Sequence, residues 1–78
     1  MMKEFVEFIA KHLVDSPDGV SIEEVTPNDH TIEFVLKVSA DDVGKVIGKH
    51  GKTAQAMRIL LTAVAAKEGK RAILKILD

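Results

Sequence analysis

The stretch that decides the fold of this chain lies just past its middle and reads Val46-Ile47-Gly48-Lys49-His50-Gly51-Lys52-Thr53. It places two glycines three residues apart inside a region that otherwise has a helical pattern. Because a glycine in a helix interior costs roughly 1 kcal/mol relative to alanine, this pair predicts a break between two helices. Glycine has no Cβ, so the backbone here can approach another group closely. Bare amides beside lysines favour a phosphate as that group.

Charge is unevenly divided along the chain, although the formal net charge is only −1. Residues 1–42 contain three Lys and ten Asp or Glu, a balance of −7, whereas residues 43–78 contain eight Lys or Arg and two acids, a balance of +6. No acid falls between positions 43 and 67. A solvated surface is the ordinary explanation of a charge run. Because this basic block contains the glycine loop, it favours an anionic partner at the loop.

Length and composition exclude several classes of protein. A chain of 78 residues is predicted to form one small domain, residues 1–78. The absence of cysteine excludes a disulfide framework and fits a cytoplasmic protein. No apolar run is long enough to span a bilayer, and none has the pattern of a signal peptide. The three histidines fall on separate elements, and no Ser/His/Asp set can be assembled, so we expect no metal, no cofactor and no enzymatic activity.

The hydrophobic pattern predicts six elements in the order helix, strand, strand, helix, helix, strand, over residues 2–14, 20–26, 31–39, 40–47, 52–68 and 72–77. The second half of the first strand loses its alternation, which indicates a bulge or a sheet edge, and residues 27–30 predict a turn. The two-helix connection between the last two strands favours their parallel pairing. We therefore expect an α+β domain of two layers, with the helices packed on one face of a three-stranded mixed sheet.

Structural roles are expected for several side chains in the first half of the chain. The aromatic residues fall at positions where we expect the core, namely Phe5, Phe8 and Phe34. Ser39 followed by Asp42 has the spacing of a capping box at the start of a helix. The helix dipole favours acids in that first turn, which explains Asp41 and Asp42 without a catalytic role.

The second half of the chain offers two surfaces with different patterns. The 52–68 helix is apolar around most of its circumference, and its polar exceptions form one stripe that faces solvent, Gln55, Arg58 and Thr62. On the face of the sheet away from the helices we expect a few apolar residues, Val35, Ile73 and Leu77. These are either scattered exposed side chains, which are common, or a dimer surface.

The element order, with a G-x-x-G loop between the second and third helices, resembles the type II KH domains. The spacing of the glycines alone is a weak signal, because many loops contain it. The same spacing between two helices, in this topology and with a basic middle, is specific. The resemblance covers the whole chain. Together with the 46–54 core, the Ala65–Lys70 run and the compact length make it similar to the small bacterial single-KH proteins.

The resemblance implies that the chain binds single-stranded RNA, with about four nucleotides held in a narrow groove. The loop passes close to the sugar-phosphate backbone, with Lys49 and His50 facing phosphates. Val43, Val46 and Ile47 are candidate contacts to bases, and the 72–77 strand is the candidate far wall. For Arg58, RNA contact and plain solvation stay equally open. The RNA-binding residues that we predict are Lys45, Val46, Ile47, Gly48, Lys49, His50, Gly51, Lys52 and Arg58.

Partners are also implied by the resemblance. Proteins of this kind form homodimers and pair with a larger KH-containing protein. The apolar pattern of the chain itself gives the expectation of no membrane partner. The complex is regarded as an RNA chaperone in post-transcriptional regulation that affects cell shape and peptidoglycan homeostasis. A second binding surface also makes physical sense, because linked sites multiply a weak affinity.

Other readings of the loop are possible. The loop can be a purely structural turn, in which case the chain is a protein-interaction or dimerisation adaptor with a vestigial KH loop. Gly51-Lys52-Thr53 also matches the end of a nucleotide-binding P-loop, G-x-x-x-x-G-K-[ST]. The first glycine of that motif would fall at position 46, which is Val46. The sequence therefore argues against ATP binding.

Overall fold

The computed structural model describes residues 2–77. Its helices and strands are α1 Met2–Leu13, β1 Ser21–Asn28, β2 Thr31–Lys37, α2 Val43–Ile47, α3 Lys52–Lys67 and β3 Arg71–Ile76. Short 3-10 turns occupy Pro17–Gly19, Ala40–Asp42 and Lys49–Gly51. The predicted element order is confirmed, and each predicted boundary lies within about two residues of the observed one, apart from the start of α2, where residues 40–42 form a 3-10 turn.

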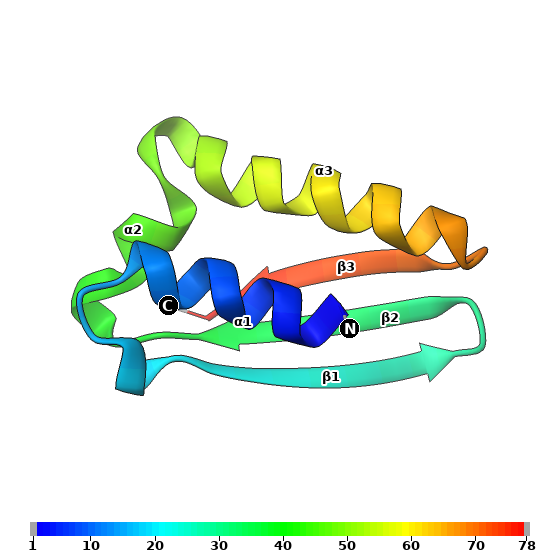
Figure 1. Cartoon of the computed structure of the whole chain (residues 1–78), viewed down its shortest axis with the longest axis horizontal. Coiled ribbons are helices and arrows are strands. Elements are labelled where there is room, and N and C mark those ends of the chain that lie inside the picture. Colours follow the sequence, from blue (N-terminus) through cyan, green and yellow to red (C-terminus); the bar gives the residue numbers. More distant parts are fainter. Residues whose placement is uncertain (1, 78) are drawn as a thin grey trace.

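The sheet has the order β1-β2-β3, with β1 antiparallel and β3 parallel to β2. Phe34 on the central strand stands opposite Glu24 on one side and Leu74 on the other. Figure 1 shows α1 crossing the sheet while α3 runs alongside β3 in the opposite direction. The loop between α2 and α3 lies at one end of the molecule, and the β1–β2 turn lies at the other. This α+β arrangement is the one predicted, and it is consistent with a type II KH domain.

The β1–β2 connection is tighter than predicted. Pro27 and Asn28 belong to β1, so the turn is limited to Asp29 and His30. Pro27 falls in a register shift between Val25 and Asn28, on an edge strand where its missing N–H does little harm to the ladder. The Asn28 side chain then accepts a hydrogen bond from the His30 N–H at 2.8 Å, which closes the turn. The lost alternation in the second half of β1, predicted to mark a bulge or a sheet edge, thus coincides with a register shift on an edge strand.

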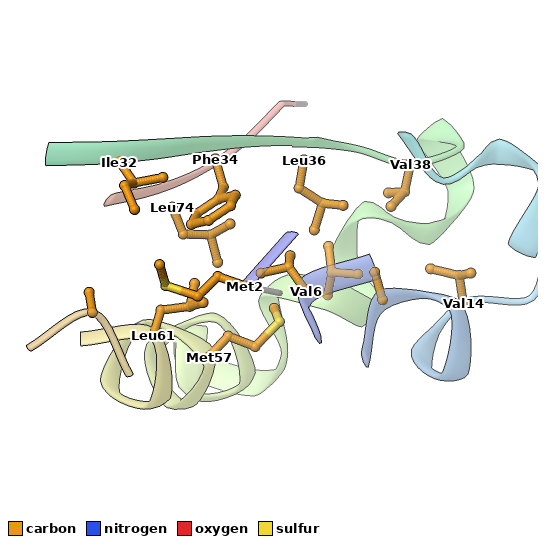
Figure 2. Close-up of a cluster of buried hydrophobic side chains, with 13 residues drawn as sticks. Met2, Val6, Val14, Ile32, Phe34, Leu36, Val38, Met57, Leu61 and Leu74 are labelled. Atoms are coloured by element: carbon orange, nitrogen blue, oxygen red, sulfur yellow. The ribbon is translucent and has the colours of Figure 1, made fainter. Parts of the chain in front are cut away.

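The core lies between the sheet and the helices, as Figure 2 shows. The predicted alternation of β2 is confirmed, because the side chains at every second position from 32 to 38 are buried. The buried apolar residues that form the core are Met2, Val6, Ala10, Val14, Ile32, Phe34, Leu36, Val38, Val46, Met57, Leu61, Ala65 and Leu74. Burial of each of the larger ones, Val, Leu, Ile, Phe or Met, stabilises a fold by about 1.5–3 kcal/mol.

The prediction that Phe8 belongs to the core is wrong. Its side chain is 63% exposed, while Phe34 is fully buried and Phe5 is partly buried. Met2, Val6 and Ala10 follow each other at intervals of four residues and form the stripe that faces the sheet, so Phe8 points to the opposite side of the helix. Its ring packs on His12, with 4.3 Å between ring centroids, and the His12 Nδ1 donates to the Phe8 carbonyl oxygen at 2.8 Å.

Only one side of α3 is buried. Ala54, Met57, Leu61 and Ala65 form that side, and the predicted polar stripe is exposed as expected. Several large apolar side chains on the outer side are exposed, namely Ile59, Leu60 and Val64. Among residues 2–77, no helix is long and apolar enough to cross a membrane.

Candidate nucleic-acid interface

The loop after α2 has an unusual backbone. Gly48 has φ 79° and ψ 171°, His50 has φ 58° and ψ 26°, and Gly51 has φ 73° and ψ 11°. Within residues 2–77, His50 is the one residue other than glycine with positive φ. L-residues avoid this region, although histidine enters it more often than most. Three of the four residues from 48 to 51 thus have positive φ, which turns the chain sharply from α2 into α3.

The two glycines of the loop are required for different reasons. A Cβ added at Gly48 would lie 2.1 Å from the Thr53 Oγ1 and 2.6 Å from the Thr53 Cβ. Gly48 is therefore needed both for its positive φ and for the close approach of Thr53. A Cβ added at Gly51 would meet nothing within 4 Å, so only its φ of 73° favours glycine there. The role of Thr53 was not predicted from the sequence.

Backbone amides of the loop are open to a ligand. The Gly51 N–H donates to the Gly48 carbonyl oxygen at 3.1 Å, but the N–H groups of Lys49 and His50 have no hydrogen-bond partner within the described residues. Lys49 has a negative φ, whereas His50 is left-handed. Successive residues of opposite handedness direct their N–H groups into one concave site that suits an anion.

The start of α3 adds to the positive potential of the loop. Gly51 is the N-cap residue, and no side chain caps the helix there. A helix N-terminus carries about half a positive charge and presents unpaired amides. Lys49, His50 and Lys52 are exposed beside it, and none of them forms an ion pair within residues 2–77. Together these groups have the chemistry of an anion-binding site.

Neighbouring predicted residues differ in their accessibility. Ile47 and Gly48 are partly exposed, as is Val43 at the start of α2. Val46, in contrast, has no exposed surface and belongs to the core cluster. Because a fully buried side chain offers no surface to a ligand, the predicted contact between Val46 and a base is corrected to a packing role.

Lys45 lies near the loop but is engaged elsewhere. Its ammonium group forms an ion pair with Asp15 at 2.5 Å and a longer one with Asp42 at 3.6 Å. The hydrogen bond to Asp15 raises the pKa of Lys45 above its usual value, against the effect of burial. Asp15 comes from the segment after α1, 30 residues away in the sequence, so no local pattern could have predicted this pair.

The capping box expected at Ser39 and Asp42 does not form. Neither side chain caps a helix, and Asp42 is buried with 2% of its surface exposed. Its carboxylate instead accepts hydrogen bonds from the N–H groups of Asp15 at 3.3 Å and Ser16 at 3.1 Å. Burial raises the pKa of Asp42, but these N–H donors and Lys45 outweigh it and hold that pKa below its usual value.

Arg58 joins α3 to the free edge of β3. Its Nε and Nη2 both lie 3.3 Å from the Leu74 carbonyl oxygen. The Arg71 N–H donates to the carbonyl oxygen of His30, just before β2, at 2.7 Å, and the Leu77 N–H donates to that of Leu36 in β2 at 2.9 Å. Because ladder bonds alternate along a strand, Leu74, three residues from each, directs its backbone toward the free edge. A guanidinium has five N–H donors, so three donors of Arg58 have no partner within the described residues.

No enclosed pocket and no cluster of three potential metal ligands occurs in residues 2–77. The narrow groove implied by the resemblance to KH domains is thus not present as a cavity. The residues that the structure brings together on an accessible surface are those of the loop, Gly48, Lys49, His50, Gly51 and Lys52.

Comparisons with known proteins agree with this fold. A family model described as the KH domain of KhpA/KhpB matches residues 3–76. The RNA-binding protein KhpA of Caldanaerobacter subterraneus is 50% identical over 76 residues, which cover 97% of this chain and 100% of that protein. Those of Clostridium acetobutylicum and Chlamydia pneumoniae are 49% and 47% identical, covering 97% and 99% of this chain and 100% and 97% of the relatives. No solved structure matches. The chain therefore belongs to the KhpA/KhpB family of KH domains.

Proposed function

We propose that this protein binds single-stranded RNA, with the sugar-phosphate backbone lying against residues 48–52. The observation that carries the proposal is the pair of unpaired N–H groups at Lys49 and His50, beside the uncapped start of α3. Phosphate is the anion that such amides and flanking cations bind best. The name RNA-binding protein, which the KhpA relatives carry, supports RNA as its source.

Each loop residue has a distinct part in this proposal. The glycines allow close approach of the RNA backbone, while Lys49, His50 and Lys52 contact phosphates. Arg58 extends the surface along α3 with its free donors. Ile47 and Val43 offer partly exposed apolar contacts to bases.

Such a small surface predicts weak binding by one chain. Non-specific electrostatic affinities lie at roughly 10⁻⁴ to 10⁻⁶ M at physiological salt. A second RNA-binding surface on a partner would raise the effective affinity without new contacts on either chain. We therefore propose that the protein acts as a homodimer or together with a larger KH-containing protein of the KhpB kind.

The outer side of α3 is the surface that best suits a second copy of the chain. Leu60 and Val64 are one turn apart, and they are 48% and 40% exposed. Exposed Ala56 and Ala63 continue the same uncharged surface. A two-fold axis places each residue near its own copy, which apolar residues tolerate and like charges do not. The face of the sheet away from the helices is less suitable. Its Glu33–Lys75 ion pair is formed by the two residues that stand opposite Ile73 and Val35.

The cellular role that we propose follows from family membership. It is that of an RNA chaperone in the cytoplasm, acting in post-transcriptional regulation with effects on cell shape and peptidoglycan homeostasis. One family model describes both KhpA and KhpB, which supports a KhpB-like partner that presents a similar helix for pairing.

Binding to a panel of fluorescein-labelled single-stranded RNAs tests the proposal. The variant Lys49→Asp/His50→Asp should lose at least about tenfold in affinity, because it removes a cation and places two acids at the amides. The chain offers a matched control in Lys11→Asp/His12→Asp, which makes the same change at exposed positions of α1. Equal affinity of the two folded variants would reject the loop as the RNA site.

An adaptor without RNA binding is the second candidate, and the exposed apolar side of α3 favours it. It predicts partner binding that survives the loop variant and an absence of salt-dependent RNA association. A salt titration separates the candidates, because phosphate contacts weaken steeply as the salt concentration rises.

A further inference from the structure

We infer that Asp42, Asp15 and Lys45 form a latch that positions α2 and its loop for RNA, and that Lys45 acts through this latch rather than by contacting phosphate. The inference deepens the RNA-binding proposal above and rests on it. It reassigns a lysine that its position in the sequence placed among the RNA contacts.

Asp42 is the centre of the latch. Among residues 2–77 it is the sole charged side chain that is buried. Its two carboxylate oxygens accept hydrogen bonds from consecutive backbone N–H groups, those of Asp15 and Ser16. The segment after α1 is thereby attached to the residue that precedes α2, across 27 positions of sequence. Figure 1 shows these two parts of the chain at the same end of the molecule.

Lys45 closes the latch from the other side. It lies three residues after Asp42, which puts the two side chains on the same side of the helical turn. Its ammonium group contacts both Asp42 and Asp15. A buried carboxylate needs such partners, because an unpaired buried charge is very unfavourable. Lys45 thus compensates the charge that fixes α2 to the segment after α1.

The loop depends on this attachment because α2 is short. Its five residues, Val43–Ile47, are too few to form a stable helix in isolation. Val46 anchors the helix to the core, and the latch anchors its start. Gly48 follows directly, with its N–H donating to the Gly44 carbonyl oxygen at 2.9 Å. A tilt of α2 would therefore move Gly48 against Thr53, where there is no free space.

The charge of Asp42 provides a test in which two explanations differ in sign. If Asp42 influenced RNA only through its charge, removing that charge would strengthen RNA binding. If Asp42 positions the loop, the same change would weaken binding. Asp41 is the matched control, because it is adjacent and exposed and forms no hydrogen bond or ion pair of its side chain within the described residues.

The first experiment compares Asp42→Asn with Asp41→Asn in RNA affinity and in the amide spectrum of the free protein. We expect Asp42→Asn to weaken RNA binding about tenfold, the scale of one lost hydrogen bond to a charged group, and to shift the Gly48 and Gly51 amide resonances. Asp41→Asn should leave these resonances unchanged, and its RNA affinity should stay the same or rise slightly. Equal behaviour of the two variants would overturn the inference.

The second experiment uses Lys45→Met, which serves also if Asp42→Asn fails to fold. Each phosphate contact on a single strand contributes about 0.7 to the slope of log K against log salt. Lys49→Met should lower the slope by about that amount. Lys45→Met should weaken RNA binding with the slope unchanged, and Lys45→Arg should restore affinity. A slope that falls equally in Lys45→Met and Lys49→Met would show a phosphate contact at Lys45 and overturn the inference.

The amide readout separates this inference from the function on which it rests. If the unmodified protein binds no RNA, the proposed function fails. The Gly48 and Gly51 resonances of the free variants still decide the positioning role, since they require no RNA. Unchanged resonances in both Asp42→Asn and Lys45→Met would contradict the latch.

Discussion

Two regions of α3 differ sharply in what surrounds them. At its N-terminal end, exposed cations lie beside a tight turn of positive-φ residues that holds the unpaired amides of Lys49 and His50. Its outer middle, around Leu60 and Val64, is exposed, apolar and uncharged. One helix thus presents a surface for a polyanion and, farther along, a surface for another protein. If these assignments are correct, the two activities can be removed separately.

The largest effect is expected from Gly48→Ala, which breaks the first region. The new Cβ would overlap Thr53, and the alanine would have to adopt the positive φ of Gly48. Overpacking costs about 1–3 kcal/mol and the backbone strain about 1–2 kcal/mol. We expect the free energy of unfolding to fall by about 2–5 kcal/mol in urea titrations, with loss of RNA binding.

Gly51→Ala sharpens that result as a control. This substitution introduces only backbone strain from the positive φ, because the Cβ of the new alanine would have nothing within 4 Å. We expect a loss of about 1–2 kcal/mol. If both glycine variants lost the same free energy of unfolding, the close contact between Gly48 and Thr53 would not exist in solution.

Leu60→Asp tests the second region. An acid at a two-fold apolar contact has no partner and sits near its own copy, so the dimer dissociation constant should rise at least about a hundredfold. Sedimentation velocity measures the change, with Gln55→Asp on the polar stripe as control. The affinity of one chain for a short RNA should stay the same or fall slightly. A monomeric unmodified protein at high concentration would rule out this contact.

Acid should weaken the latch before it affects the outer side of α3. The folded pKa of Asp42 lies below its ordinary value of 3.8, so its contribution to stability is complete above the ordinary value and is lost as pH falls through the folded one. We expect the unmodified protein to lose more stability than Asp42→Asn as the pH falls below 3.8. Equal losses in the free energy of unfolding of the two proteins over that pH range, measured by urea titration, would contradict this role of Asp42.

The smallest effect is expected from Arg58→Met, on the polar stripe of α3. The change removes the two hydrogen bonds to the Leu74 carbonyl and the remaining donors. RNA affinity should fall about two- to fivefold, and the salt slope by up to about 0.7. Arg58→Lys keeps the charge without the fork of donors. A loss of stability in Arg58→Met with unchanged RNA affinity would indicate a structural role alone.

The first region was largely predictable from the sequence and the second was not. Glycine spacing, the acid-free basic block and strand alternation are local signals, and they predicted the loop and the three-stranded sheet. Which side of α3 is buried depends on where the sheet and α1 lie, and Leu60 is as apolar as the buried Leu61. Phe8 was misplaced for the same reason.

Long-range polar contacts were also beyond local reasoning. Asp42 matches a capping box by spacing, yet its partners lie 26 and 27 residues away. Part of the acidic first half of the chain folds onto the basic second half and neutralises Lys45. Positive charge in the sequence therefore overestimates the positive surface, and the loop cations are those that stay unpaired.

A titration of the ¹⁵N-labelled protein with a short single-stranded RNA tests the central claim most directly. The account predicts that the largest amide shifts occur at Lys49, His50 and the first turn of α3, with smaller shifts along β3. Saturating shifts on the outer side of α3 or on α1, with the amides of residues 48–52 unmoved, would contradict it.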